Sequence, residues 1–263
     1  MRFDVITLFP ELFEPFLASG VTRRAYASGQ VEVRLWNPRD HAEGNYRRVD
    51  DRPFGGGPGM VMLAEPLARC LAAIRADRAE GQQARAPLVL FSPIGRRLDH
   101  AAVQDWSAGA GAILLCGRYE GVDQRFIDAY VDAQISLGDF VLSGGEIAAM
   151  ALLDAVARLQ PGVVHDEGSH QLDSFNPALD GLLDCPHYTR PELYEDERVP
   201  DVLRSGNHAA IRRWRLKQSL GRTWLRRPDL LGARPLSKTE LKLLEEFRQE
   251  QAGTQVVLEP QRG

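Results

Sequence analysis

The sequence has 263 residues, a formal net charge of −4, 44% hydrophobic and 26% charged residues, and three cysteines. Such a chain holds one large or two modest folded domains and is neither disordered nor fibrous. The odd cysteine count and the lack of a C-x-x-C pair argue against a disulfide framework and a zinc site, and favour the reducing cytoplasm. The apolar N-terminus carries Asp4 and Glu11, so it is no secretory signal, and no run of about 18 uncharged apolar residues predicts a membrane span.

Short apolar segments alternate with helical patterns over residues 1–160. The predicted strands are 2–8, 31–36, 86–92, 111–116 and 133–136. The predicted helices are 65–80, 96–108 and 146–159. The last three strands are apolar throughout, which is typical of strands buried on both faces of a parallel sheet. The alternation predicts an α/β domain with a mainly parallel sheet.

The remaining sequence has a different character. Residues 161–180 lack periodicity and are rich in Pro, Gly, Asp and His, which predicts a linker. From 181 to 263 helical patterns dominate and no clear strand appears, and Ser237 with Glu240 forms a capping box before the last helix. We therefore predict a small basic all-α domain after the linker.

The positive charge is concentrated in this second domain. Between residues 198 and 234, ten Arg and Lys face only two Asp, a net charge of +8 that leaves −12 for the rest of the chain. If 212–226 is one helix, four arginines form a stripe along it: Arg212, Arg215, Arg222 and Arg226. Gly221 weakens such a helix. Phosphate contacts by these arginines would suit a nucleic acid, while the alternative is a solvated helical face.

Two tryptophans lie among these arginines. Trp214 and Trp224 could stack on bases or pack in a core, and we favour a core position for at least one of them.

Several common catalytic motifs are absent. The glycine cluster FGGGPGM (54–60) does not fit G-x-G-x-x-G, and no G-x-x-x-x-G-K-[ST], H-E-x-x-H or G-x-S-x-G occurs. The six histidines show no metal-ligand spacing. The sequence therefore does not support a dinucleotide fold, a phosphate-binding loop, a zinc protease or the usual serine esterase.

Three glycine-rich turns follow the three buried strands. They are FSPIG (91–95), CGRYEG (116–121) and SLGDFVLSGGE (136–146). Ligands of open parallel sheets bind at the carboxyl ends of the strands. The turns predict a site where backbone groups contact a neutral or adenosine-type ligand, and the alternative is three tight turns without a ligand.

Longer motifs carry a family resemblance. DVITLFPELF, VDDRPFGGGPGM, CGRYEGVDQR, SLGDFVLSGGE, LLDCPHYTRP and IRRWRLKQSLGRTWLRRP together resemble the TrmD family of bacterial tRNA (guanine-N1)-methyltransferases, from residue 1 to about 235. The resemblance implies a SPOUT methyltransferase domain with a trefoil knot, an exception to the rule against knotted chains. It also implies an obligate homodimer with active sites at the subunit interface, and methylation of the guanine immediately 3′ of the anticodon.

The resemblance implies that the three turns hold S-adenosyl-L-methionine. The implied donor-binding residues are Pro93, Gly117, Tyr119, Glu120, Ser136, Leu137, Gly138, Asp139, Phe140, Val141, Leu142, Gly144 and Gly145. Phe140 stands where the family commonly carries Tyr, so a hydroxyl contact is lost there while main-chain contacts are kept.

The resemblance also assigns the chemistry. Asp173 of the D-S-F element is the implied general base, Arg158 is the implied catalytic arginine, and Glu120 is the implied neighbour of a Mg²⁺ ion. Taken alone, Asp173 could simply start a turn and Arg158 could cap a helix. The stretch NPALD after Phe175 is longer than the family's usual form, which leaves Asp184 as the alternative carboxylate.

A last group of residues is implied to contact the anticodon stem-loop. Its members are Asp184, His187, Tyr188, Arg212, Arg215, Lys217 and Arg222. The rival interpretations are a knotted methyltransferase with another RNA target, and a catalytically inactive RNA-binding dimer.

Overall fold

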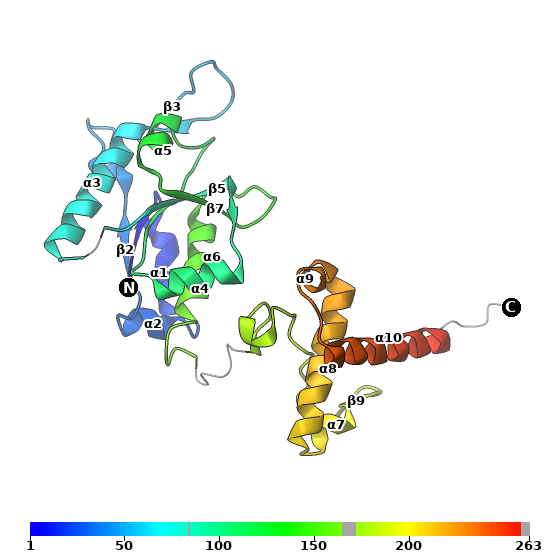
Figure 1. Cartoon of the computed structure of the whole chain (residues 1–263). Helices are drawn as coiled ribbons and strands as arrows, with labels where there is room; N and C mark the ends of the chain where they lie inside the picture. The colour runs from blue at the N-terminus through cyan, green and yellow to red at the C-terminus, as the bar shows by residue number, and fades with distance from the viewer. Residues whose placement is uncertain (84, 165–171, 259–263) are drawn as a thin grey trace. The chain divides into compact units, whose positions relative to one another are not determined.

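The structure is a computed structural model that describes residues 1–83, 85–164 and 172–258. The chain divides into two compact units, Met1–Glu167 and Gly168–Gly263. Figure 1 shows an α/β fold in the first unit and mostly helices in the second. No helix of the described residues is long and apolar enough to cross a membrane.

A five-stranded parallel sheet forms the centre of the first unit. The strands, in their order across the sheet, are β2 (Glu32–Trp36), β1 (Arg2–Ile6), β6 (Ile113–Leu115), β5 (Leu88–Arg97) and β7 (Ala133–Ser136). Each neighbouring pair is parallel, and Val5 on β1 lies opposite Leu35 on one side and Leu114 on the other. The predicted strands and the parallel α/β class are confirmed.

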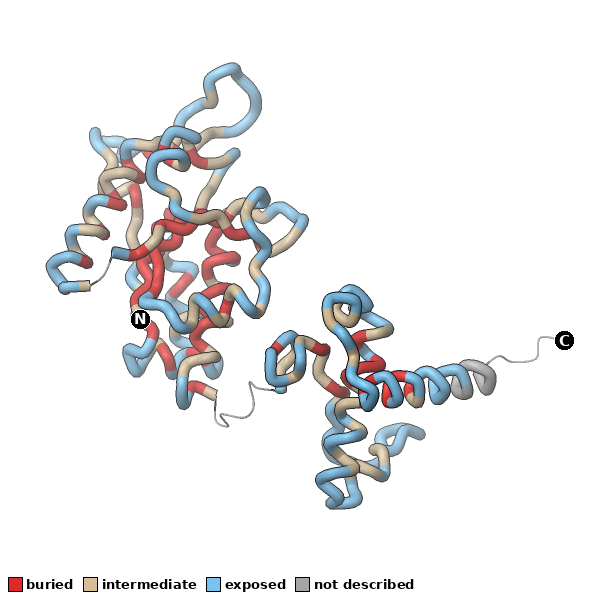
Figure 2. Tube along the Cα trace, viewed as in Figure 1, coloured by how far each residue is buried: buried red, intermediate tan, exposed pale blue. Residues whose placement is uncertain are grey.

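Both faces of the sheet are buried, and this explains why β6 and the first part of β5 are apolar throughout. The inner strand β1 also buries Arg2 and Asp4, whose side chains form an ion pair with each other. Val89 and Leu114 belong to the hydrophobic cluster on one face, whereas Leu88 and Ile113 belong to the cluster on the other. Figure 2 shows the buried residues concentrated in the sheet and in the helix beside it. Alternate side chains point to opposite faces, so a strand covered on both sides needs apolar residues at every position.

Helices supply these two layers. The helices on the first cluster are α1 (Phe13–Ala18), α2 (Arg23–Ala27), α4 (His100–Ala108) and α6 (Glu146–Ala157), and those on the second are α3 (Ala64–Glu80) and α5 (Gln124–Tyr130). The three helices expected over 65–80, 96–108 and 146–159 are confirmed, with α4 starting later because the Asp99 side chain caps its N-terminus.

The largest departure from the expected sheet lies in β5. The strand does not end at residue 92 but resumes pairing with β7 after a register shift between Phe91 and Arg96. Both of these residues pair with Ile135, so residues 92–95 bulge out of the sheet. Gly95 returns so close that a Cβ there would lie 2.5 Å from the backbone nitrogen of Ile135. The turn expected at 91–95 is thus an excursion within one strand.

Short elements complete the first unit. The turn-rich stretch after β2 contains a 3-10 helix and two short strands, η2 (Pro38–His41), β3 (Asp50–Asp51) and β4 (Val61–Met62), and η1 (Pro10–Leu12) precedes α1. The backbone of Met62 donates to Gly121 and accepts from Asp123, so β4 lies beside the loop that follows β6.

The second unit is built around two long helices. Its elements are η4 (Pro177–Leu179), β8 (Leu193–Tyr194), β9 (Glu197–Arg198), α7 (Asp201–Arg204), α8 (His208–Arg226), α9 (Pro228–Gly232) and α10 (Lys238–Leu258). The prediction of an all-α domain is wrong in one respect, because β8 and β9 pair as a small antiparallel hairpin. Two exposed residues per strand are too few to give a periodic signal.

The packing of α8 on α10 depends on a glycine. A Cβ at Gly221 would overlap the ring of Phe247, which is buried. Gly221 lies inside a continuous α8, so the helix tolerates it and gains a close contact with its neighbour. The predicted capping box is confirmed: the Ser237 backbone N donates to Glu240 Oε2 over 2.8 Å, and Glu240 N donates to Ser237 Oγ over 3.2 Å.

Part of the expected linker belongs to the second unit. The backbone N of Phe175 donates to the carbonyl O of Leu182 over 2.9 Å, and Ser174 Oγ accepts from Asp184 N over 2.9 Å. Residues 172–180 therefore fold back onto the helical unit, while residues 165–171 of the expected linker lie outside the described residues.

Candidate functional site

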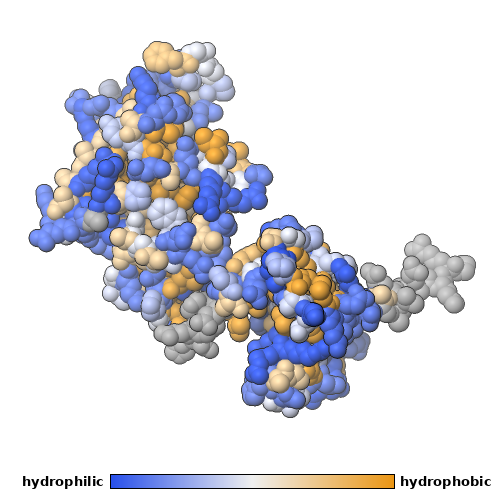
Figure 3. Space-filling model, in the orientation of Figure 1, coloured by the Kyte–Doolittle hydropathy of each residue, from blue (hydrophilic) through white to orange (hydrophobic). Residues whose placement is uncertain are grey.

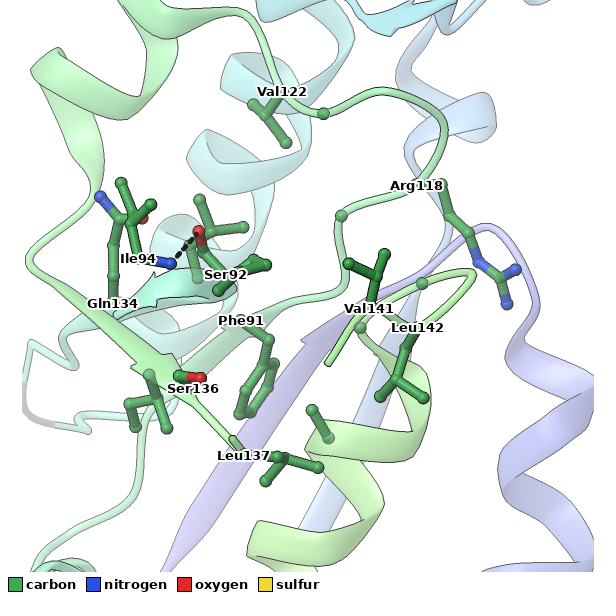
Figure 4. Close-up of a pocket in the computed structure, with 18 of the residues that line it drawn as sticks. Phe91, Ser92, Ile94, Arg118, Val122, Gln134, Ser136, Leu137, Val141 and Leu142 are labelled. Carbon is green, nitrogen blue, oxygen red and sulfur yellow. Dashed lines mark hydrogen bonds between the residues drawn. The ribbon is translucent and has the colours of Figure 1, made fainter. Parts of the chain in front are cut away.

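The three glycine-rich turns line one cavity at the carboxyl edge of the sheet. Its volume is about 370 Å³, within the usual range for a small-molecule site. Figure 4 shows Phe91 and Ser92 from β5, Ser136 and Leu137 from the end of β7, and Val141 from the following loop around this space. The donor-binding residues implied by the sequence line it, with the exception of Asp139: Pro93, Gly117, Tyr119, Glu120, Ser136, Leu137, Gly138, Phe140, Val141, Leu142, Gly144 and Gly145.

Two of the turns are locked together by their backbones. Gly145 N donates to the carbonyl O of Gly117 over 3.0 Å, and Gly144 pairs with Arg118 as an isolated antiparallel bridge. A Cβ at Gly145 would lie only 2.7 Å from the Cα of Cys116. The glycine is required here because it permits the two loops to touch.

The third turn exposes backbone and apolar groups. Ser136 Oγ accepts from Gly138 N and donates to Gly138 O, both over 3.1 Å, and Gly138 has a φ of +154°. Phe140 and Val141 are 55% and 85% exposed, a large apolar area for one loop. Asp139 points elsewhere, since it pairs with Arg97 over 3.1 Å.

Glu120 contributes the one carboxylate among the described residues that line the cavity. Its side chain reaches the glycine loop before β4, where a Cβ at Gly59 would overlap it. Arg118 also lines the cavity but is paired with Glu146 over 2.9 Å, so the unpaired charge that the lining offers is the negative charge of Glu120, which suits a ligand with positive charge. A single carboxylate does not make a Mg²⁺ site by itself, because magnesium needs further oxygen ligands. These residues do not fit a resident metal ion.

Arg158 lies at the far end of α6 from this cavity. Gly144 and Gly145 line the cavity just before α6 begins, whereas Arg158 is the residue that follows its last turn. The helix has 12 residues and is therefore about 18 Å long. One chain does not bring Arg158 to its own cavity.

Asp173 belongs to the second compact unit. Its carbonyl O accepts from Asn176 N over 3.2 Å, and the neighbouring Ser174 hydrogen bonds to Asp184. The structure thus ties the D-S-F element to the L-L-D-C motif.

The residues expected to contact RNA, except Lys217, gather on one side of α8. Arg222 Nη1 donates to the Asp184 carbonyl over 3.2 Å, the rings of Tyr188 and Trp214 are 6.3 Å apart, and His187 Nε2 lies 2.7 Å from Asp184 Oδ2. We call this surface the basic face; its members are Asp184, His187, Tyr188, Arg212, Arg215 and Arg222. Figure 3 shows a strongly hydrophilic surface over the first half of α8.

The opposite side of α8 differs, because its cations are neutralised. Arg213 Nη2 lies 2.7 Å from both carboxylate oxygens of Glu246, and Lys217 is buried and 2.6 Å from Glu250. The Arg213 guanidinium lowers the pKa of the Glu246 carboxyl. Lys217 is therefore not part of the basic face, although we expected it there. By contrast, Arg212 and Arg215 are exposed and form no ion pair with any described residue.

Neither tryptophan occupies the core. Trp214 and Trp224 are both half-buried, and the Arg248 guanidinium lies 4.7 Å from the Trp224 ring centroid. The expected core position is wrong, because the core of this unit is filled by leucines and by Phe247 at the crossing of α8 and α10.

Two thiols near the candidate residues are protonated. Burial raises the pKa of Cys116, under the cavity, well above its ordinary value. Burial, followed by the charge of Asp184, also raises the pKa of Cys185. Asp184, Cys185 and His187 bring their donor atoms within 4.8 Å of one another, a grouping that the sequence spacing did not indicate.

Sequence reasoning missed an ion pair between Arg118 and Glu146 beside the cavity. Arg118 lies inside the C-G-R-Y-E-G motif and Glu146 ends S-G-G-E, so both residues belong to motifs that the sequence analysis had identified. Only their spatial proximity across two loops could have singled them out.

Comparison with known proteins identifies a family for this chain. The family model described as tRNA (Guanine-1)-methyltransferase TrmD matches residues 1–233. The chain is 77% identical over 233 residues to a protein of Paracidovorax citrulli named tRNA (guanine-N(1)-)-methyltransferase, covering 89% of this chain and 91% of the relative. Relatives with the same name are 74% identical in Polaromonas sp. (88% of this chain, 89% of the relative) and 57% identical in Chromobacterium violaceum (95% and 97%).

Proposed function

Because this chain belongs to the tRNA (guanine-1)-methyltransferase TrmD family, we propose that it transfers a methyl group from S-adenosyl-L-methionine to N1 of the guanine immediately 3′ of the anticodon in tRNA. The observation that carries the proposal is the cavity at the carboxyl edge of the parallel sheet, enclosed by three glycine-rich turns. Because its substrate would be tRNA, we also propose that the enzyme works in the bacterial cytoplasm.

The cavity suits the methyl donor in three ways. Its walls offer main-chain groups of Gly117, Leu137 and Gly138, which can hydrogen bond to an adenosine. Its apolar side chains, including Leu142, can cover a ring. Glu120 supplies negative charge for a cationic donor. The close-packed loops around it are where we place the trefoil knot of the SPOUT fold.

The donor supplies an electrophilic methyl group on a sulfonium. The protein must remove the N1 proton of guanine, which is a poor nucleophile while protonated. We assign this proton to a carboxylate oxygen of Asp173, with Asp184 as the alternative. A carboxyl group with an ordinary pKa of about 3.9 is too weak a base to do this alone. We therefore assign to Arg158 the stabilisation of the negative charge that develops on guanine O6.

The position of Arg158 supports a homodimer. In one chain, Arg158 lies about 18 Å along α6 from the cavity residues that precede the helix. Arg158 at the C-terminal end of α6 can act on a ligand in a cavity only if that cavity belongs to a second copy of the chain. The exposed apolar side chains of Phe140, Val141 and Ile147 next to the cavity suit burial by such a copy.

The basic face is our proposed contact with the anticodon stem-loop. Its arginines are exposed and lie on the same unit as Asp173, so phosphate binding and proton removal would be carried by one part of the chain. A base in the loop can be turned out and recognised at its edge without melting a helix.

A transfer assay tests the proposal. The protein is incubated with methyl-labelled S-adenosyl-L-methionine and tRNA transcripts that carry either guanine or adenine 3′ of the anticodon, and the modified nucleoside is identified. We expect N1-methylguanine only from the guanine transcript. Label on another base would indicate a different RNA target, and no label at all would indicate a non-catalytic RNA-binding protein.

A further inference from the structure

Arg118 joins the two glycine loops at the cavity through its side chain. Its Nη1 donates to the carbonyl O of Ser143 over 3.2 Å, and its Nη2 lies 2.9 Å from Oε2 of Glu146. The guanidinium carbon lies 4.4 Å from the ring centroid of Phe9. In Figure 4 this side chain extends away from Ser136 on the opposite wall. The charge of Arg118 is therefore used to hold the loops and is not directed at the ligand.

Glu146 anchors this arrangement from the inside. It is 1% exposed and begins α6, where the helix dipole favours a negative charge. Its Oε1 accepts from Thr7 Oγ1 over 2.9 Å, and its Oε2 forms an ion pair with Arg118 but has no hydrogen-bond partner among the described residues. Thr7 follows β1, so the pair connects both loops to the end of that strand. Removing the only cation beside a buried carboxylate strongly destabilises the folded protein.

The loop that contains Gly144 packs closely against the side chain of Arg118. A Cβ at Gly144 would overlap the side chain of Arg118, and Gly144 and Arg118 already pair through their backbones. Arg118 thus lies flat against the loop that it holds. The residues next to this backbone pair, Gly117 and Gly145, are hydrogen bonded to each other and both line the cavity.

We propose that Arg118 and Glu146 act as a positioning pair that sets the register of the two loops and thereby the affinity for the methyl donor. The inference rests on the proposed function, because it takes the donor assigned there as the ligand of the cavity. Neither side chain has to touch the reacting atoms. Misplacing binding groups by about 1 Å can lower a rate about 100-fold, so loss of register is a large effect.

A double-mutant cycle tests the pair. Arg118→Gln, Glu146→Gln and the double variant are titrated with S-adenosylhomocysteine by calorimetry. We expect each single change to raise the Kd about tenfold or more, and the double change to be no worse than the worse single one, because contacting residues are not additive. The matched control is Arg125→Gln, an 81% exposed arginine paired with Asp123 just after the same loop, whose Kd should not change.

Further measurements separate positioning from a general structural role. Thermal unfolding and tRNA affinity are measured on the same variants; a purely structural pair would lower Tm and leave the donor Kd of the folded protein unchanged. If Arg118→Gln does not fold, Arg118→Lys and Thr7→Val provide milder changes, for which we expect a smaller but measurable rise in Kd. Folded variants with wild-type Kd overturn the inference. Failure of the wild-type protein to bind S-adenosylhomocysteine overturns the proposed function instead.

Discussion

The cavity and the basic face offer opposite kinds of groups to the ligands that we propose for them. Around the cavity, glycines bring backbone groups together, and the charge of Arg118 is neutralised by Glu146. On the basic face, Arg212 and Arg215 remain exposed and unpaired within the described residues. A small donor of fixed shape favours rigid main-chain contacts, whereas a long polyanion favours mobile cations spread over a surface. The difference predicts that changes in one region leave the binding property of the other intact.

Removal of the proposed base should give the largest effect. In Asp173→Asn we expect the turnover to fall about 10²- to 10⁴-fold, because the proton of guanine N1 loses its acceptor, while the donor and tRNA affinities persist. Single-turnover kinetics with saturating donor measure this. The control is Asp196→Asn, an exposed carboxylate between β8 and β9. Near-normal turnover in Asp173→Asn would transfer the role to Asp184.

Adding a methyl group at Gly145, where the two loops touch, tests whether their close contact is needed for donor binding. In Gly145→Ala the added Cβ would meet Cys116 Cα at 2.7 Å, so the loops must move apart. We expect donor affinity to fall about tenfold or more, stability to fall by about 1–3 kcal/mol, and tRNA affinity to be retained. Calorimetric titration and thermal unfolding measure these changes. Gly232→Ala is the control, since nothing lies within 4 Å of a Cβ there; unchanged donor binding in Gly145→Ala would refute the tight-loop account.

The basic face is tested by its salt dependence. In Arg215→Gln we expect weaker tRNA binding and a slope of log K against log salt that is smaller by about 1, with donor affinity unchanged. Arg213→Gln is the matched control on the same helix, because Glu246 already neutralises that charge. Equal effects of the two changes would mean that α8 has no distinct RNA-binding side.

The smallest expected effect concerns how the second unit is held together. The Arg234 guanidinium, 2.5 Å away, and the Ser237 amide lower the pKa of Glu240 to about 2. Because the folded pKa lies below the unfolded one, the carboxylate stabilises the fold above about pH 4.5, and this contribution is lost as the pH falls towards 2.

Denaturant unfolding measures the contribution. We expect Glu240→Gln to be less stable than the wild type by about 2 kcal/mol at pH 7, and the difference to shrink towards zero near pH 2. A difference that does not depend on pH would assign the loss to packing instead.

The sequence predicted the sheet well because its signals are local. The short strand β6 is covered on both faces and apolar throughout, and the Ser237–Glu240 box spans one turn. The arginine stripe was also visible, since the helical period alone places Arg215 and Arg222 on one side.

What the sequence could not predict depends on distant partners. No residue near Lys217 in the sequence indicates its ion pair with Glu250. Likewise, no residue near Gly221 indicates that it packs against Phe247. The ion pair of Arg118 with Glu146 also joins loops that are far apart along the chain.

The central claim is that the cavity of one copy is completed by Asp173 and Arg158 of another, and mixed dimers test it directly. One protomer carries Asp173→Ala and Arg158→Ala with an intact cavity, and the other carries Gly145→Val with intact polar residues. The account predicts that the two inactive proteins regain about a quarter of wild-type methylation when mixed, because half of the random dimers hold one complete site. A mixture that forms heterodimers and remains inactive would contradict it.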